Sequence, residues 1–284
     1  MDFATLTSFG WLGLILLVWI GLSVGSFLNV VIHRMPIMMQ RDWRAQAREI
    51  LTLDAEAPEP AYNLMVPRSA CPNCGHQITA LENIPVLSWL FLRGKCSDCK
   101  TPISIRYPLV EIATALITIA VITVFGFTWL GGMVCLLSWL LIAAFGIDYD
   151  TKLLPDQLTY PVLWLGLLSN LLWPIVSIES AVIGAVAGYL FLWGTYWAFK
   201  LVTGKEGMGH GDFKLFAGLG AWAGWAALPS IILIAAVLGL VYALARVASR
   251  RQQSSEPIPF GPFLAGAGWV TIMFRDTVLS LTTF

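Results

Sequence analysis

Long apolar runs, separated by short polar segments, dominate the pattern of this chain. Eight runs are candidates for membrane-spanning helices: residues 11–32, 107–126, 129–147, 158–176, 180–199, 213–226, 228–246 and 260–281. The run at 213–226, with about 14 residues, is too short to cross a hydrocarbon core of ~30 Å upright, so it is either a half-helix or fused with its neighbour. The pattern predicts an all-α polytopic membrane protein with about eight transmembrane helices.

Composition supports a membrane protein, because 57% of the residues are apolar and only 12% are charged. The charged fraction is about half that of an average soluble domain. The first apolar run has no basic residue before it and no small-residue cleavage site after it. We therefore expect a retained helix there and not a removed signal peptide.

The basic residues predict the orientation. With eight crossings, 16 of the 17 lysines and arginines fall on one face, and the positive-inside rule makes that face cytoplasmic, with both termini outside. The net charge is zero and the basic residues form no stripe, so no nucleic-acid partner is expected. The predicted location is the membrane itself, with several crossings.

One long hydrophilic stretch, residues 34–105, interrupts the apolar pattern. Residues 34–62 have the pattern of a short amphipathic helix followed by a Pro-rich acidic linker; the alternative, which the composition favours, is a solvated connector. Residues 84–92 are too apolar for a free loop, so we expect them to lie against the bilayer surface or other helices. The predicted division is a first transmembrane helix (1–33), a cytoplasmic loop (34–105) with a metal-binding unit (63–105), and a seven-helix domain (106–284).

Four cysteines stand in this loop as two Cys-x-x-Cys pairs separated by 21 residues: Cys71, Cys74, Cys96 and Cys99. Paired knuckles of this kind are typical of a zinc site. The alternatives are four free thiols or two disulfides, and a reducing cytoplasm argues against disulfides. Four thiolates would close the coordination shell, so one zinc ion would stabilise the fold and would not catalyse a reaction.

Two aspartates at the edges of apolar runs are candidate catalytic residues. Asp148 ends the third run, and Asp212 follows a glycine-rich segment that begins at Gly207. The eight-crossing topology places both at the cytoplasmic membrane boundary. Two carboxyls brought together would share one proton, so that one activates water and the other polarises a peptide carbonyl, as in aspartyl proteases.

Several acidic residues also have structural interpretations. Interfacial aspartates often cap helices, and Asp156 is expected to cap the fourth helix, whereas Asp150 is expected to be solvated. Glu111 lies inside an apolar run and is either a site residue or a buried packing group. Asn29 has the same two interpretations. No Gly-x-Gly-x-x-Gly motif follows a strand, so nothing in the residues themselves locates a cofactor.

Five motifs resemble those of bacterial prepilin peptidases, the inner-membrane enzymes of type IV pilus and type II secretion systems. The resemblance extends over about residues 20–280. The motifs are Gly25-Ser26-Phe27-Leu28-Asn29-Val30-Val31-Ile32-His33-Arg34-Met35-Pro36, Arg68-Ser69-x-Cys71-Pro72-x-Cys74, Arg93-Gly94-Lys95-Cys96-x-x-Cys99, Asp148-x-Asp150-x-x-Leu153-Leu154-Pro155-Asp156 and Gly209-His210-Gly211-Asp212-Phe213-Lys214.

The resemblance implies that Asp148 and Asp212 are catalytic. It implies cleavage of the leader of prepilins or pseudopilins at the cytoplasmic face, followed by methylation of the new N-terminus with S-adenosylmethionine. Gly94 and Lys95 lie in the segment that the family associates with methyl transfer, and with Glu111 they are the weak candidates for the cofactor site. The alternatives are a leader peptidase without methylase activity and a non-enzymatic membrane scaffold with a zinc knuckle.

Overall fold

The computed structural model describes residues 10–52, 60–249 and 258–282. Within these residues the regular structure is helical, apart from two isolated β-bridges in the cysteine segment. The chain forms two compact units, residues 1–123 and 124–284. The predicted all-α, polytopic fold class is confirmed by this helical content together with the apolar helices, described below, that are long enough to cross a membrane.

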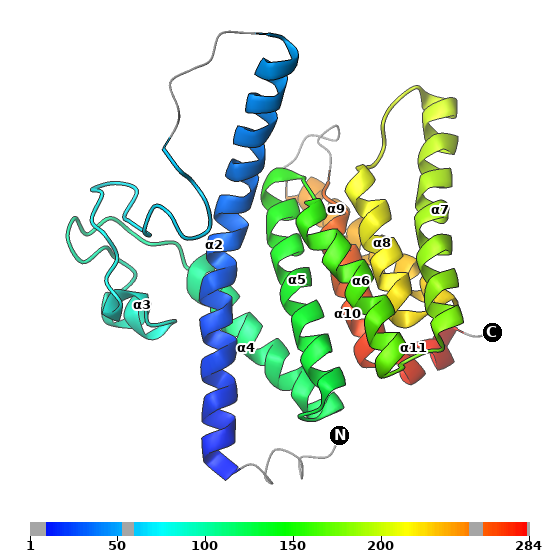
Figure 1. Cartoon of the computed structure of the whole chain (residues 1–284), viewed down its shortest axis with the longest axis horizontal. Coiled ribbons are helices and arrows are strands. Elements are labelled where there is room, and N and C mark those ends of the chain that lie inside the picture. Colours follow the sequence, from blue (N-terminus) through cyan, green and yellow to red (C-terminus); the bar gives the residue numbers. More distant parts are fainter. Residues whose placement is uncertain (1–9, 53–59, 250–257, 283–284) are drawn as a thin grey trace. The chain divides into compact units, whose positions relative to one another are not determined.

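The first unit is built on one long helix, α2 (Gly10–Ile50), of 41 residues (Figure 1). At 1.5 Å per residue it is about 60 Å long, roughly twice the thickness of a hydrocarbon core. Residues 34–50 are helical, as expected, but they form no separate helix, because α2 continues through Pro36. The bounds 1–33 of the first transmembrane segment stay a prediction. Residues 37–50 contain no glycine and no second proline that would end the helix. The acidic part of the predicted linker, at 53–59, lies outside the described residues.

Helix α2 packs against α4 (Arg106–Phe125) through glycines one turn apart. A Cβ atom on Gly21 would lie 2.5 Å from the Cα atom of Ala115, and one on Gly25 would lie 2.6 Å from the Cα atom of Glu111. Such small-residue stripes let helix backbones approach closely in membranes. Asn29, one turn further, donates a hydrogen bond to the Tyr107 carbonyl at 3.1 Å, so its observed contact is a packing one.

Beyond α2, the described part of the hydrophilic stretch contains two short helices, η1 (Leu81–Asn83) and α3 (Leu87–Phe91). The apolar stretch 84–92 was expected to lie against the bilayer or other helices. Its Val86 backbone amide donates to Glu111 Oε2 of α4 at 2.7 Å. This hydrogen bond attaches the stretch to a helix of the first unit.

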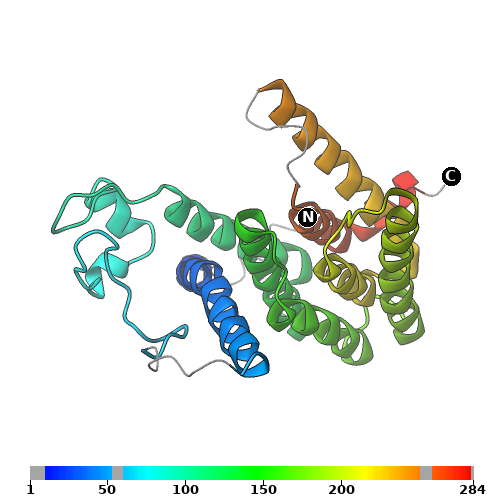
Figure 2. The ribbon, with the colours of Figure 1, turned by 90° about the horizontal axis from the view of Figure 1, so that it is seen from above.

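The second unit is organised around α8 (His210–Ala223), which lies between α6 and α7 in Figure 1. Eleven of the 14 residues of α8 are buried. The remaining elements are α5 (Trp129–Thr151), α6 (Asp156–Leu172), α7 (Ile178–Thr203), η2 (Trp225–Ala227), α9 (Leu228–Ala248), α10 (Gly261–Met273) and α11 (Arg275–Thr282). Figure 2 shows α9 at the outer edge of this unit, and most of its residues are not buried.

Close backbone contacts hold α8 in place. A Cβ atom on Gly184 of α7 would fall on the Gly220 carbonyl, and one on Gly220 would fall on the Gly184 carbonyl. On the opposite side, Trp222 Nε1 donates to the Val162 carbonyl of α6 at 2.8 Å. Because protein and not lipid surrounds α8, a helix too short to span a bilayer is stable there. It is a separate helix, divided from α9 by η2.

Five helical stretches among the described residues are long and apolar enough to cross a membrane: Gly10–Ile50, Arg106–Phe125, Trp129–Thr151, Ile178–Thr203 and Trp225–Ala248. Helices α6, α8 and α10 have 17, 14 and 13 residues. Each predicted run overlaps a helix, but the number of eight crossings stays a prediction. The last run was wrongly predicted as continuous, because α10 ends at Met273 and polar residues from Arg275 begin α11.

Candidate active site and metal centre

Asp148 lies in the last turn of α5, and the residue is only 5% exposed. A Cβ atom on Gly261, the first residue of α10, would lie 2.5 Å from Asp148 Oδ2. The Gly261 backbone amide hydrogen-bonds to the same carboxyl group. Only glycine permits so close an approach. Sequence reasoning missed Gly261, whose one local signal is the proline that follows it at the start of a helix.

Asp212 is the third residue of α8 and is 7% exposed. Its backbone amide donates to the carbonyl of the N-cap residue Gly209 at 3.2 Å, and its carboxyl accepts from the Gly209 amide. The second bond is one half of a capping box, in which an acidic side chain satisfies a free amide at the helix N-terminus, while Gly209 has no side chain to form the other half. This bond fixes the orientation of the Asp212 carboxyl.

The two carboxyls are 64 positions apart in sequence, yet the structure brings them close enough to interact electrostatically. Asp148 Oδ2 and Asp212 Oδ1 are buried and have no hydrogen-bond partner among the described residues. Two like charges buried near one another cannot both ionise cheaply, so the pair can hold one shared proton. Such a pair can activate water and polarise a carbonyl at the same time.

The neighbouring aspartates have different surroundings. Asp150 is exposed, as expected. The prediction that Asp156 caps the fourth helix was wrong, because Pro155 occupies the N-cap position of α6. Asp156 Oδ1 instead lies 2.6 Å from Lys214 Nζ on α8. Sequence reasoning quoted Lys214 within a motif but gave it no partner.

The four cysteine sulfurs of the first unit lie within 4.8 Å of one another. The Sγ atoms of Cys71 and Cys99 are 3.7 Å apart, and those of Cys74 and Cys96 are 3.9 Å apart. A tetrahedral zinc ion with bonds of about 2.3 Å places its sulfur ligands about 3.8 Å apart. All four are free thiols, so the donor set and its spacing fit one zinc ion.

The two knuckles have the same backbone design. Each first cysteine donates its amide to a carbonyl five residues later, Cys71 to His76 and Cys96 to Thr101, at 2.8 and 2.9 Å. The residue after each second cysteine has a positive φ, 73° at Gly75 and 59° at Lys100. Each knuckle is therefore a tight turn that directs two sulfurs toward the same point.

The thiols differ in acidity because their neighbours differ. Hydrogen bonds from the Thr101 hydroxyl and amide lower the pKa of Cys99 to about 5. At Cys74 the His76 amide favours the thiolate, but desolvation and the neighbouring sulfurs outweigh it and raise the pKa to about 12. Four thiolates therefore coexist here only with a bound cation, which is the chemistry of a metal site.

His76, which sequence reasoning did not single out, joins the two knuckles. Its Nε2 atom lies 3.2 Å from both carboxylate oxygens of Glu82 and 3.2 Å from Ser97 Oγ in the second knuckle. Hydrogen bonds from Ser97 and from Thr79 lower the pKa of Glu82 to about 2. The side chains thus connect the first knuckle, the η1 segment and the second knuckle.

The weak cofactor candidates occupy separate positions in this unit. Gly94 has a φ of 65°, and a Cβ atom there would lie 2.8 Å from the Trp89 ring. Glu111 is buried and accepts the hydrogen bond from Val86. Lys95 is exposed. The observed contacts give Gly94 and Glu111 roles in fixing the 84–95 segment.

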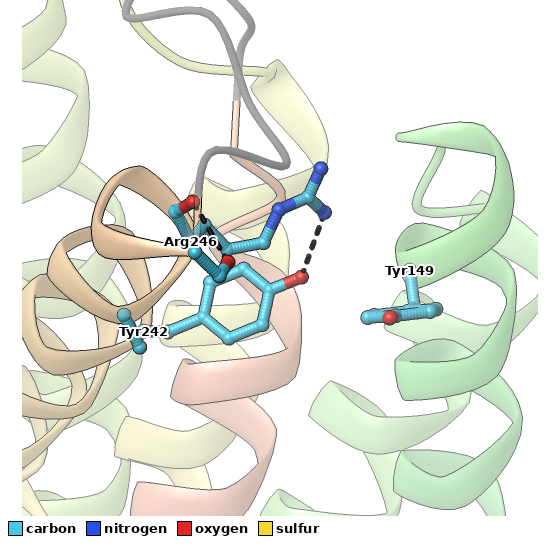
Figure 3. Close-up of a pocket in the computed structure, with 5 residues that line it drawn as sticks. Tyr149, Tyr242 and Arg246 are labelled. Carbon is cyan, nitrogen blue, oxygen red and sulfur yellow. Dashed lines mark hydrogen bonds between the residues drawn. The ribbon is translucent and has the colours of Figure 1, made fainter.

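Tyr149, the residue after Asp148, lines an open pocket of about 610 Å³. Figure 3 shows Tyr149 of α5 facing Tyr242 and Arg246 of α9 across it. Arg246 Nη1 donates to the Tyr242 hydroxyl at 3.1 Å. A guanidinium and two phenol hydroxyls suit a negatively charged or hydroxyl-bearing group.

Models of known protein families match both halves of the chain. Residues 19–125 match the Bacterial Peptidase A24 N-terminal domain, and residues 135–244 match the Type IV leader peptidase family. The chain belongs to the type IV leader peptidase family. The resemblance inferred from its motifs is therefore confirmed, and the type IV leader peptidase match includes both Asp148 and Asp212.

Relatives in this family match nearly the whole chain. The prepilin leader peptidase/N-methyltransferase of Aeromonas hydrophila is 56% identical over 94% of this chain and 93% of its own length. The protein of the same name from Stutzerimonas stutzeri is 58% identical over 91% and 90%, and that from Pseudomonas aeruginosa is 54% identical over 91% and 89%. No solved structure matches the chain.

Proposed function

We propose that this protein removes the leader peptide of prepilins or pseudopilins and then methylates the newly exposed N-terminal amine. The observation that carries the proposal is the buried pair of carboxyls from Asp148 and Asp212. It stands in a chain more than half identical to prepilin leader peptidase/N-methyltransferases over about nine-tenths of its length. The proposed substrates are therefore prepilins or pseudopilins.

The two aspartates would cleave the peptide bond together. The ionised carboxyl takes a proton from water, whose oxygen attacks the scissile carbonyl, while the protonated carboxyl hydrogen-bonds to the carbonyl oxygen. As the C–N bond breaks, the departing amine takes up a proton from the pair. Space for the substrate backbone exists beside Gly209, where a Cβ atom would meet nothing closer than Asp212 Oδ2 at 3.7 Å.

Cys71, Cys74, Cys96 and Cys99 would hold one zinc ion, and their spacing supports this assignment. The ion would supply folding free energy to residues 63–105 and no catalytic chemistry, because four thiolates leave no open position. The proposed division of labour places the zinc unit in the loop 34–105 and peptide cleavage in the domain 106–284.

We propose S-adenosylmethionine as the methyl donor, in keeping with the N-methyltransferase name of the relatives. Gly94, Lys95 and Glu111 stay the candidates for its site, since they border the segment between the knuckles and α4. Gly94 and Glu111 would act by holding that segment in shape. Lys95, which is exposed, is the one of the three free to reach a ligand directly.

The proposed location is the bacterial inner membrane, with the zinc loop and the aspartates facing the cytoplasm. Reporters fused after residue 60, 152, 205 or 252 should then report the cytoplasm, and reporters near 128, 177 or 227 the outside. A cytoplasmic signal at 177 would contradict the eight-crossing topology. It would also remove the argument that a single face holds both aspartates.

The direct test of function uses the purified enzyme in lipid, a prepilin substrate, and mass spectrometry of the product N-terminus. Leader removal should proceed without S-adenosylmethionine, and adding it should give a product that carries one further methyl group. A shortened product that never gains a methyl group would mean that the protein is a leader peptidase without methylase activity. No shortened product would favour the scaffold alternative and overturn the proposal.

A further inference from the structure

An ion pair joins the two segments that carry the proposed catalytic aspartates. Lys214 Nζ on α8 lies 2.6 Å from Asp156 Oδ1 at the start of α6. Lys214 is two residues from Asp212, and the ammonium lies 5.1 Å from the centroid of the Tyr160 ring. The Lys214 side chain is 27% exposed and that of Asp156 is 46% exposed.

The connection between α5 and α6, residues 152–155, is fixed at both of its ends. At the first end, the Lys152 amide donates to the Asp148 carbonyl at 2.9 Å, and Lys152 has a φ of 58°. At the second end, Asp156 is held by Lys214. The ion pair therefore links α8 to the connection that begins after Asp148 and its helix α5.

Leu154, in the middle of this connection, packs against backbone next to both aspartates. A Cβ atom on Gly211, which precedes Asp212, would lie 2.5 Å from Leu154 Cβ. A Cβ atom on Gly261, which contacts Asp148, would lie 2.8 Å from Leu154 Cδ1. Leu154 thus lies between the backbone at Gly211, next to Asp212, and the backbone at Gly261, which contacts Asp148. A shift of the connection would change the distance between these two backbones.

Further along α6 and α8 the contact does not depend on the ion pair. A Cβ atom on Gly218 would lie 2.7 Å from Val162 Cγ1, and Trp222 donates to the Val162 carbonyl. A partly exposed ion pair contributes little to global stability. Loss of the pair is therefore expected to free only the ends of α6 and α8, where Asp212 lies.

We propose that Asp156 and Lys214 are positioning residues that set the separation of the Asp148 and Asp212 carboxyls. They act by clamping the beginning of α6 to the beginning of α8. This inference rests on the proposed function. Two groups that act on one water and one carbonyl require close placement, and a displacement of about 1 Å can slow a reaction roughly 100-fold.

The test measures cleavage kinetics of the full-length enzyme in lipid, with Lys214→Met, Asp156→Asn and the double variant. Each is expected to lower kcat by about 10- to 100-fold with little change in KM. The double variant should resemble the single ones, because each change breaks the same pair. Lys214→Arg, which keeps the charge and the reach, should retain most activity. Lys205→Met, at an exposed lysine in the loop before α8, is the matched control.

The pH profile of kcat separates positioning from a general structural effect. Carboxyls held less closely repel each other less, so the two limbs of a bell-shaped profile should approach one another in Lys214→Met and Asp156→Asn. Parent kcat and parent profile width in both variants would overturn the clamp while leaving the proposed function intact. Increases in KM in the single variants that add up in the double variant would also overturn the clamp, because they would indicate that each side chain contacts the substrate separately. Failure of the parent enzyme to cleave would overturn the proposed function itself.

Discussion

The cysteine segment, residues 63–105, and the helical unit, residues 124–284, hold their shapes in different ways. The cysteine segment has helices of only three and five residues, two isolated β-bridges, and mostly exposed or half-buried side chains. The helical unit encloses α8 by backbone contacts so close that glycine is required. The cysteine segment would therefore depend on bonds to the proposed zinc ion, whereas the helical unit depends on close packing of its helices. Damage to one should leave the other largely intact, so the two proposed activities should be separable.

The largest expected effect comes from Asp148→Asn or Asp212→Asn. Each should lower leader cleavage by at least roughly 10²- to 10⁴-fold, because an amide can neither take the proton from water nor supply one. Methylation of a pre-cleaved peptide and helical content by circular dichroism should stay near parent values. Asp150→Asn, two residues along α5 and exposed, is the control that should retain cleavage. Substantial cleavage by Asp148→Asn would remove Asp148 from the active site.

Cys71→Ser and Cys99→Ser should have the reverse pattern. Elemental analysis is expected to find about one zinc per parent chain and much less in either variant, since binding by four thiolates can supply about 10 kcal/mol of folding free energy. Methylation should fall more than cleavage. Cys135→Ala is the control, because Cys135 is buried in α5 and is not one of the four clustered cysteines, so its loss should leave the zinc content unchanged. A zinc-free parent with both activities would mean that the four cysteines are ordinary thiols.

Gly184→Ala tests the helical unit by itself. The added methyl group would fall on the Gly220 carbonyl, so α7 and α8 must separate and the unfolding temperature in detergent should drop. Gly194→Ala on the same helix meets no atom within 4 Å and should be neutral or stabilising by about 0.5–1 kcal/mol. Zinc content should be equal in both. Equal unfolding temperatures for the two variants would contradict the close α7–α8 contact.

The smallest effects are expected from glycines inside the cysteine segment. Gly94→Ala combines a positive φ with a contact on the Trp89 ring, whereas Gly75→Ala has a positive φ but open space around it. A strained non-glycine residue costs roughly 1–2 kcal/mol, so Gly75→Ala should weaken zinc retention against a chelator only slightly. Gly94→Ala should reduce methylation further at nearly normal cleavage. A larger loss from Gly75→Ala than from Gly94→Ala would show that the Trp89 contact is unimportant.

The sequence by itself determined the features whose cause is local or compositional. Apolar runs identify membrane helices because a hydrocarbon core demands apolar side chains over a fixed length. The four cysteines predict one metal site because their spacing within each knuckle is short, and the structure places their sulfurs within 4.8 Å of one another. The family of the chain also followed from short motifs, each of which lies within a few consecutive residues. The roles of Asp148 and Asp212 stay a prediction, although the structure brings the two carboxyls together.

Only the tertiary structure decided which distant segments meet. The continuation of α2 through Pro36 was missed because a proline weakens a helix without always ending it. No local pattern identifies three contacts between distant segments: that of Gly261 with Asp148, those that enclose α8, and the pairing of Asp156 with Lys214 across 58 positions. The local sequence around a carboxylate in the first turn of a helix is the same whether that carboxylate caps the helix or forms an ion pair. The choice depends on which side chain the packing of another helix brings within reach, and that is a property of the folded chain.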